Sequence, residues 1–151
     1  MGEVAGGVGV KEGVLTAAPV NGASRTVSLG LQSEVQQTQA IRELQGALNA
    51  SGISDATIGV RGSSVTGASY RTGAPFRSAS DIDVFIESGQ LTNGLSTSKN
   101  IPGFVHPDSI MKNYPLLDQW AADWTKILGR DITPGAFTPG NIPNHPAILF
   151  K

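Results

Sequence analysis

The sequence predicts a single α+β domain, a small mixed sheet with flanking helices, because two different apolar periodicities run along one chain. Apolar residues at steps of three and four, the spacing of one helix face, are Ile41, Leu44 and Leu48. Apolar residues that alternate with other residues, the spacing of a strand, are Ile82, Val84 and Ile86. A chain of 151 residues is long enough to bury one core of ordinary size.

Composition excludes several classes of protein. Hydrophobic residues make up 39% of the chain and charged residues 15%, unlike a charge-rich disordered segment or a long coiled coil. The formal net charge of -1 argues against a nucleic-acid binder that works by general counterion release. With 0 cysteines, the chain has no disulfide, thiol nucleophile or zinc–thiolate site. No apolar stretch approaches the length of a membrane span, so we expect no membrane-spanning segment in this sequence.

The chain divides into two parts. Residues 1–30 are rich in Gly, Ala and Val, which predicts a flexible arm or linker. Residues 31–151 carry the periodic patterns and are expected to form the folded domain. If this domain is exported, we expect the export signal to lie on a longer parent protein, because the first residues of this sequence have no signal-peptide pattern.

The first elements of the predicted domain are a helix and a short strand. We expect the helix over residues 33–50, where Ser33 and Gln36 have capping-box spacing and Gly52 follows the end. The strand is expected over residues 56–61, where apolar residues alternate with small or polar ones.

The second half of the chain alternates loops with ordered segments. Residues 63–80 are rich in Gly and Ser and predict a functional loop, after which residues 81–87 alternate as a strand. A helix is expected over residues 115–128, because proline opens it and glycine follows its last turn. The proline-containing tail, residues 130–151, holds three short apolar pieces that we expect to be edge strands.

Residues with chemical potential lie where the first strand ends and the second begins. Small residues that free backbone amides and hydroxyls for phosphate oxygens are Gly62, Ser63 and Ser64. Asp81 and Asp83 share one strand face, with Cα atoms about 6.6 Å apart at the usual rise of about 3.3 Å per residue. Two such carboxylates can converge on Mg²⁺ that bridges phosphate oxygens.

Basic and aromatic residues fall in the connection between these strands. No acidic residue lies between Asp55 and Asp81, whereas this stretch contains Arg61, Arg71 and Arg77. Guanidinium groups beside carboxylates suit a polyphosphate that arginines hold at one end and a metal at the other. Tyr70 and Phe76 are candidates for stacking on a base. Each feature alone is typical of a solvated surface, but their order along the chain favours a site.

At these residues the sequence resembles the nucleotidyltransferases of the DNA polymerase beta-like superfamily. Their signature is a strand ending in Gly-Ser and then Asp-apolar-Asp on the next strand, matched here by Gly62-Ser63 and Asp81-Ile82-Asp83. The resemblance implies a nucleotidyltransferase-like fold, a nucleoside triphosphate as substrate and two Mg²⁺ ions. It further implies that Ser63 binds the triphosphate and that Asp81 and Asp83 hold the metal. The arginines, with Ser64, would contact the triphosphate or the acceptor.

A third carboxylate generally comes from a later strand in that superfamily. Glu87 shares the face of Asp83 but lies about 13 Å along a regular strand, too far to share its metal. Asp131, after the second helix and before an apolar residue, is the better candidate, although a turn aspartate explains it equally well. Without a third carboxylate, a degenerate or binding-only version of the fold is the alternative.

The long connector, with Arg61-Gly62-Ser63-Ser64 before Ser80-Asp81, looks like that of nucleotidyltransferase-type domains at the C-termini of bacterial polymorphic toxins. These are contact-dependent growth inhibition and Rhs-type effectors. The resemblance implies the C-terminal part of a secreted effector that acts in the target-cell cytoplasm on an RNA such as tRNA, or on a protein hydroxyl. It also implies a cognate immunity protein, which we expect to be acidic if it blocks an arginine-bearing cleft.

Two other readings stay open. A metal-independent ribonuclease toxin would use His106 or His145 with basic residues, although both histidines look like surface-loop residues beside prolines. This reading leaves Asp81 and Asp83 unexplained. A catalytically silent module would hold a nucleotide or a partner in the same cleft. Dependence of activity on nucleoside triphosphate and Mg²⁺ separates the three.

Overall fold

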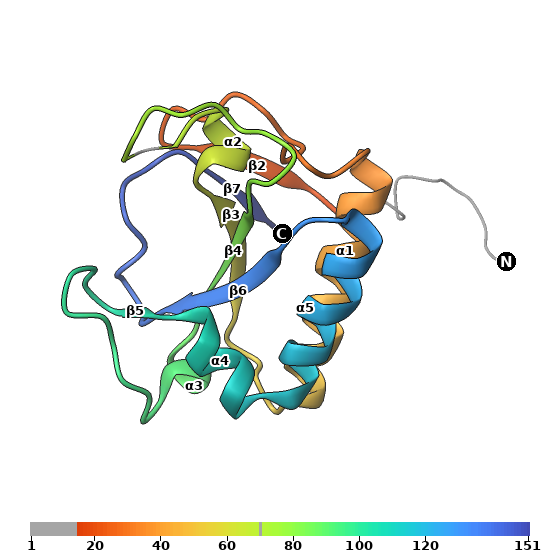
Figure 1. Ribbon diagram of the computed structural model, residues 1–151. Helices are drawn as coiled ribbons and strands as arrows, with labels where there is room; N and C mark the ends of the chain where they lie inside the picture. Colours follow the sequence, from red (N-terminus) through yellow and green to blue (C-terminus); the bar gives the residue numbers. More distant parts are fainter. Residues whose placement is uncertain (1–14, 70) are drawn as a thin grey trace, which may run out of the picture.

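The computed structural model describes residues 15–69 and 71–151, which form a six-stranded mixed sheet with helices packed beside it (Figure 1). The strand order is β2-β7-β3-β4-β6-β5, and β4 and β6 are parallel while the other neighbours are antiparallel. The strands are β2 (Ala17–Val20), β3 (Thr57–Arg61), β4 (Ile82–Glu87), β5 (Phe104–Val105), β6 (Ile132–Phe137) and β7 (Ala147–Phe150). The predicted α+β class with a mixed sheet is confirmed.

Five helices accompany these strands in the described ranges. They are α1 (Glu34–Ala50), α2 (Ser63–Thr66), α3 (Gly89–Thr92), α4 (Pro107–Asn113) and α5 (Pro115–Leu128). The Ser33 hydroxyl accepts a hydrogen bond from the Gln36 amide at 3.1 Å, so the predicted cap opens α1. Gly129, with φ of 71°, ends α5 in the left-handed conformation. Throughout these ranges no helix is long and apolar enough to cross a membrane.

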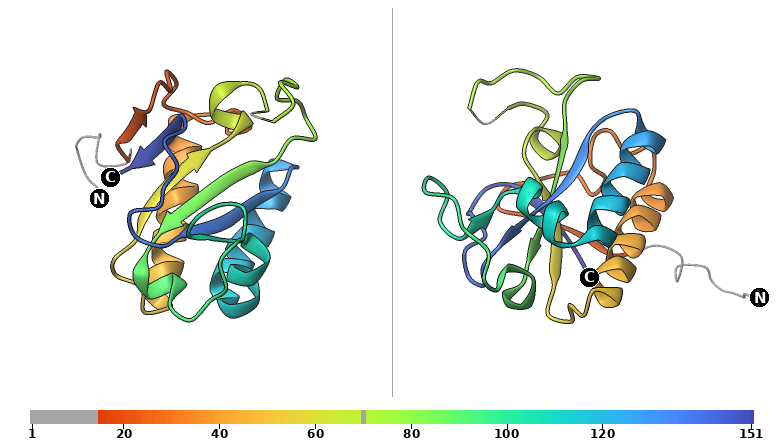
Figure 2. Two further views of the ribbon diagram at one scale, coloured as in Figure 1. Left: turned by 90° about the vertical axis from the view of Figure 1, so that its left-hand side faces the viewer. Right: turned by 60° about the horizontal axis from the view of Figure 1, so that its bottom comes forward.

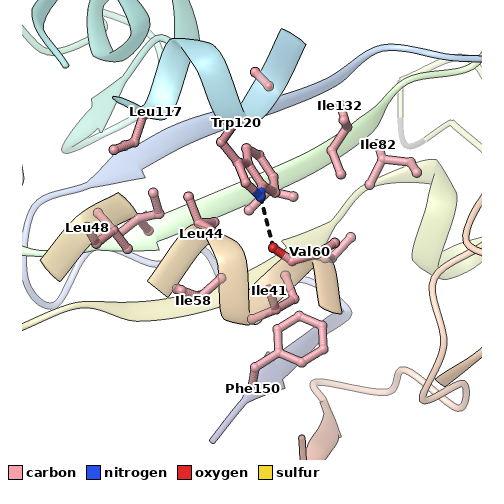
Figure 3. Close-up of a cluster of buried hydrophobic side chains, with 14 of the residues drawn as sticks. Ile41, Leu44, Leu48, Ile58, Val60, Ile82, Leu117, Trp120, Ile132 and Phe150 are labelled. Carbon is pink, nitrogen blue, oxygen red and sulfur yellow. Dashed lines mark hydrogen bonds between the residues drawn. The ribbon is translucent and has the colours of Figure 1, made fainter. Parts of the chain in front are cut away.

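The main core lies between the sheet and the helices α1 and α5, which lie side by side against one sheet face (Figures 1 and 2). Figure 3 shows Ile41, Leu44 and Leu48 facing Ile58 and Val60 of β3 across this core. The indole of Trp120 donates to the Ala40 carbonyl at 2.8 Å, and that of Trp124 donates to the Glu43 carboxylate at 2.9 Å. Both tryptophans are therefore structural.

A smaller core covers the opposite sheet face. Its buried members are Phe85, Phe137 and Ala147. The rings of Phe85 and Phe137 meet edge to face, with centroids 5.9 Å apart. The Phe85 ring lies across Gly59 on the neighbouring strand, where any side chain would collide with it. This aromatic layer supports the site described below.

The predicted arm and the predicted edge strands both need correction. Residues 1–14 lie outside the described part of the chain, but β2, within the predicted arm, pairs with β7 along its whole length. Further along the arm, Arg25 donates to the Val65 carbonyl at 2.7 Å. In the tail, β6 lies between β4 and β5, and β7 lies between β2 and β3, so both are interior strands.

Pro134 made an interior position for β6 hard to predict, because proline cannot donate a ladder hydrogen bond. The Ile82 amide donates to the Asp131 carbonyl at 2.9 Å, so in this parallel pair the odd-numbered residues of β6 bond toward β4. The nitrogen of Pro134 therefore points to the other side. On that side the two-residue strand β5 pairs only with Ala136 and Phe137, so Pro134 removes no hydrogen bond between strands.

Truncating Leu44 to alanine should destabilise the domain by about 2–5 kcal/mol, because this fully buried side chain has 0% exposure and its loss leaves a cavity. Urea unfolding measures the change. Leu116→Ala is the matched control, since Leu116 is a helical leucine with 46% exposure and should shift stability by no more than about 0.5 kcal/mol. Equal losses in the two variants would contradict the described core.

Candidate active site

A cavity of about 300 Å³ opens on the sheet face that α1 and α5 leave free. Asp81 and Asp83 lie in its wall, as their alternation with the buried residues Ile82 and Val84 requires. The lining residues are Arg61, Asp81, Asp83, Val84, Phe85, Phe104, His106, Pro107, Asp108, Thr133 and Gly135. The predicted pair of carboxylates and one predicted arginine thus share a cavity.

Strand pairing places Asp83 at the centre of this wall. Arg61 stands directly opposite Asp83 in the antiparallel pair of β3 and β4. Thr133 stands opposite Asp83 on the other side, in the parallel pair of β4 and β6. Three adjacent strands therefore contribute a cation, an anion and a hydroxyl in one row.

The turn after β3 brings the Asp83 carboxylate against Gly62. Gly62 has φ of +90°, and a Cβ built on it would lie 2.9 Å from Oδ2 of Asp83. Glycine is needed here both for the backbone conformation and for the close approach of the carboxylate. The Gly-Ser end of one strand and the Asp-x-Asp start of the next thus meet at one point.

Arg61 is held by aromatic rings. Its guanidinium carbon lies 5.4 Å from the centroid of Phe104 and 5.2 Å from that of Phe137. The guanidinium makes no hydrogen bond and no ion pair within 4.0 Å to any residue that the structure describes. Burial lowers the pKa of Arg61, and the nearby Asp83 carboxylate opposes that change. Its donors are oriented and free for an anion.

The surroundings of Asp83 shift the pKa of its carboxyl group. Its residue stays open to solvent, but desolvation of the carboxylate by surrounding protein atoms raises its pKa. Arg61 lowers the pKa of Asp83, and the like charge of Asp81 raises it further. The net direction is upward, so this carboxylate favours a cation or a proton more than an ordinary surface aspartate does.

His106 also lines the cavity, and its side chain is exposed, as expected, although the residue begins a helix. It caps α4, and its Nδ1 accepts a hydrogen bond from the Asp108 amide at 3.1 Å. In neutral imidazole this bond assigns the ring proton to Nε2. The Asp108 carboxylate lies 3.6 Å from Nδ1. The His-Pro-Asp run before the apolar Ile110 is typical of a helix start and could have indicated the cap, though not the cavity.

Other predicted site residues stand apart from the cavity wall. Ser64 has 0% exposure, and its hydroxyl has no hydrogen-bond partner among the described residues, so a nucleotide cannot touch it as the chain stands. Ser63 is half-buried and begins α2. Arg71 and Arg77 are exposed and do not line the cavity. Tyr70 lies outside the described residues.

Arg130 holds the end of the loop that contains Arg77. The Arg130 guanidinium donates to the carbonyls of Arg77 and Ser80, both at 3.0 Å, and its carbon lies 4.5 Å from the ring centroid of Phe76. The Phe76 ring is therefore already in contact with a cation.

The charge of the cavity lining differs from the expected one. With three aspartates and one arginine in its lining, the cavity is acidic, which corrects the expected basic cleft.

The third carboxylate in the cavity wall is that of Asp108 at the start of α4, and it does not come from a later strand as expected. Asp131 is exposed and lies beside the start of β4, but it is not in the cavity wall. Thr133 occupies the position across from Asp83. Over residues 15–69 and 71–151, no group of three or more His, Asp or Glu side chains could hold a metal ion. A catalytic role for Asp131 stays a prediction.

Replacing Gly62 by alanine should destabilise the protein by about 1–3 kcal/mol, because alanine is strained at this φ and its Cβ meets the Asp83 carboxylate. Urea unfolding measures the change. Gly46→Ala is the control: Gly46 is an open helical position, and its replacement should stabilise by about 0.5–1 kcal/mol. A Gly62→Ala protein as stable as wild type would contradict the turn described above.

Comparisons of the chain with models of protein families, with curated proteins and with solved structures found no match. The function proposed below therefore rests on the chemistry of the cavity and on the Asp81 and Asp83 pair in its wall.

Proposed function

We propose that this domain is a metal-dependent nucleotidyltransferase that transfers a nucleotidyl group from a nucleoside triphosphate to an RNA such as tRNA, or to a protein hydroxyl. One observation carries the proposal: Asp81, Asp83 and an unpaired Arg61 line one cavity at the Gly62 turn. Carboxylates are ligands for Mg²⁺, and a free guanidinium is a bidentate ligand for phosphate. The cavity thus offers partners for both the metal and the phosphates of a metal–triphosphate complex.

The residues present fit Mg²⁺ bound together with substrate. Magnesium is usually held by one or two carboxylates, substrate phosphates and water rather than by a cage of protein ligands. Asp81 and Asp83 supply two carboxylates, and their mutual repulsion, which raises the pKa of Asp83, is relieved by a cation. When bound, Mg²⁺ supplies charge neutralisation at the phosphates and at the departing pyrophosphate.

The chain's own contribution is orientation. Phe104 and Phe137 fix the Arg61 guanidinium before substrate arrives, so less side-chain freedom is lost on phosphate binding. In the reaction, an acceptor hydroxyl oxygen bonds to the α-phosphorus while the bond to the bridging oxygen of pyrophosphate breaks. The hydroxyl proton leaves to solvent. Arg61 would hold the phosphate oxygens, and Asp81 and Asp83 would hold the metal.

Omission of single components tests the proposal. The protein is incubated with bacterial RNA and protein, with α-labelled triphosphates, and with or without Mg²⁺. A transferase labels an acceptor only when triphosphate and Mg²⁺ are both present. Unchanged labelling after removal of Mg²⁺, or no label from any of the four triphosphates, would refute the proposal.

A metal-independent ribonuclease is the second candidate, because His106 and Arg61 line the same cavity. The Nε2 nitrogen of His106 could move a proton and Arg61 could hold the scissile phosphate. Such an enzyme would cleave RNA without triphosphate or Mg²⁺. It would lose activity in His106→Gln and keep it in Asp81→Asn, the reverse of the pattern expected of the transferase.

The biological setting is proposed on the resemblance to polymorphic toxins. In that setting the domain is the toxic part of a secreted effector, acts in the target-cell cytoplasm and is neutralised by an immunity protein. Because carboxylates outnumber cations in the cavity lining, an immunity protein that plugs this cavity would insert basic side chains rather than acidic ones.

A further inference from the structure

A second cavity of about 490 Å³ adjoins the candidate active site. It is formed by the start of α4 and by the loop between α3 and β5, and Figure 1 shows this loop on the side of the molecule away from α1 and α5. Its lining residues are Ser96, Thr97, Ser98, Asn100, Ile101, Phe104, His106 and Ser109. Phe104 and His106 belong to the walls of both cavities, so the two spaces are neighbours across these side chains.

The chemistry of the second cavity differs from that of the first. No aspartate, glutamate, lysine or arginine lines it, and Lys99 of the same loop is exposed and is not part of the wall. The wall consists instead of hydroxyls, one side-chain amide, the His106 imidazole, the Phe104 ring and an aliphatic side chain. Within the described chain, the side chains of Thr97, Asn100 and Ser109 make no hydrogen bond. The wall therefore offers neutral donors and acceptors beside apolar surface.

Local hydrogen bonds hold this wall in shape. The Ser98 amide donates to the Phe104 carbonyl at 2.7 Å, and the Ser98 hydroxyl accepts from the amides of Asn100 and Ile101 at 3.1 and 3.2 Å. The loop is also fixed to the end of β6, because the Thr138 amide donates to the Gly103 carbonyl at 2.9 Å. The cavity is thus present before any ligand arrives, which reduces the ordering cost of binding.

We propose that the second cavity binds a nucleoside, an uncharged base with its ribose, whose phosphate side lies in the first cavity. A nucleotide has the same division as the paired cavities: a charged phosphate end and a neutral, planar, hydrogen-bonding end. This inference rests on the proposed function. The nucleoside belongs either to the triphosphate or to the end of the RNA acceptor, and the recognition chemistry is common to both.

The test follows backbone amide resonances of the whole chain by NMR during titration with separate ligand halves. Free nucleosides should shift residues 96–101 and Ser109 without Mg²⁺, and inorganic tripolyphosphate with Mg²⁺ should shift Arg61 and Asp83. In the double variant Thr97→Ala, Asn100→Ala, nucleoside binding should weaken about tenfold while tripolyphosphate binding is unchanged. Lys99→Ala, from the same loop but outside the wall, should bind both ligands as wild type does.

The outcomes separate this inference from the proposed function. If nucleosides leave residues 96–109 unshifted while tripolyphosphate with Mg²⁺ still binds, the inference fails and the transferase proposal stands. If nucleosides bind but tripolyphosphate does not, the transferase proposal fails. Two further titrations of the double variant identify the source of the nucleoside. If the cavity takes the nucleoside of the triphosphate, the double variant binds nucleoside triphosphates more weakly than wild type does. If it takes the end of the RNA acceptor, the double variant binds short RNA oligonucleotides more weakly.

Discussion

Asp83→Asn is expected to lower the kcat of the proposed nucleotidyl transfer by at least about a thousandfold, because asparagine cannot replace a carboxylate that would hold Mg²⁺ beside the reacting phosphate. Asp81→Asn should have an effect of the same kind. The measurement is the rate of label transfer from triphosphate over a range of Mg²⁺ concentrations. Asp123→Asn is the matched control, since Asp123 is an exposed aspartate on α5 outside the cavity.

Loss of activity in Asp83→Asn should come without loss of fold. Desolvation raises the pKa of Asp83 in the folded state above its value in the unfolded chain, so between these two values the native chain binds more protons than the unfolded chain does. The free energy of unfolding of wild type therefore falls as the pH rises through the raised pKa, and Asp83→Asn avoids this loss. At neutral pH without Mg²⁺, its Tm should equal or exceed that of wild type. A clearly lower Tm would show that Asp83 is structural.

Arg61→Lys is expected to reduce kcat/KM by about a hundredfold although it keeps the charge. Lysine cannot reproduce a planar fork of donors held against Phe104 and Phe137, which is what bidentate phosphate binding needs. The loss should be found mainly with triphosphate, and the KM for the acceptor should change little. An Arg61→Lys protein with wild-type kcat/KM would remove Arg61 from the site.

Arg61→Ala should in addition move the pH profile. Arg61 lowers the pKa of Asp83, so its removal raises that pKa further. Since metal binding requires the deprotonated carboxylate, the acidic limb of activity should shift to higher pH relative to wild type. An acidic limb that stays in place, or shifts to lower pH, would contradict the coupling between these two residues.

The part of the site that the sequence predicts lies on two neighbouring strands. Alternation of Ile82, Val84 and Ile86 with other residues is enough to place Asp81 and Asp83 on one face, and the Gly62-Ser63 turn ends the preceding strand. These features are local, because consecutive strands pair with each other here. Helix caps such as Ser33 and Gly129 are local for the same reason, and both are confirmed.

The remainder of the site depends on contacts between distant segments. Phe104, His106 and Thr133 reach the cavity only because β6 crosses to lie beside β4 and brings β5 and the start of α4 with it. No short-range pattern encodes that crossing, and Pro134 argues against it. The arginines of the loop illustrate the converse: their sequence neighbours predict a basic cleft, yet Arg71 and Arg77 do not line the cavity. Arg130, from another segment, holds the end of this loop through its main-chain carbonyls.

Intact-mass spectrometry of the acceptor detects the product of the proposed nucleotidyl transfer. Cellular RNA and protein are incubated with each nucleoside triphosphate, Mg²⁺ and either wild type, Asp83→Asn or Asp123→Asn. We expect one acceptor to gain the mass of a nucleotidyl group, a nucleoside monophosphate less water, with wild type and Asp123→Asn, and to gain nothing with Asp83→Asn or without Mg²⁺. No mass gain with any triphosphate, an equal gain with Asp83→Asn, or RNA cleavage that needs no triphosphate would contradict this expectation.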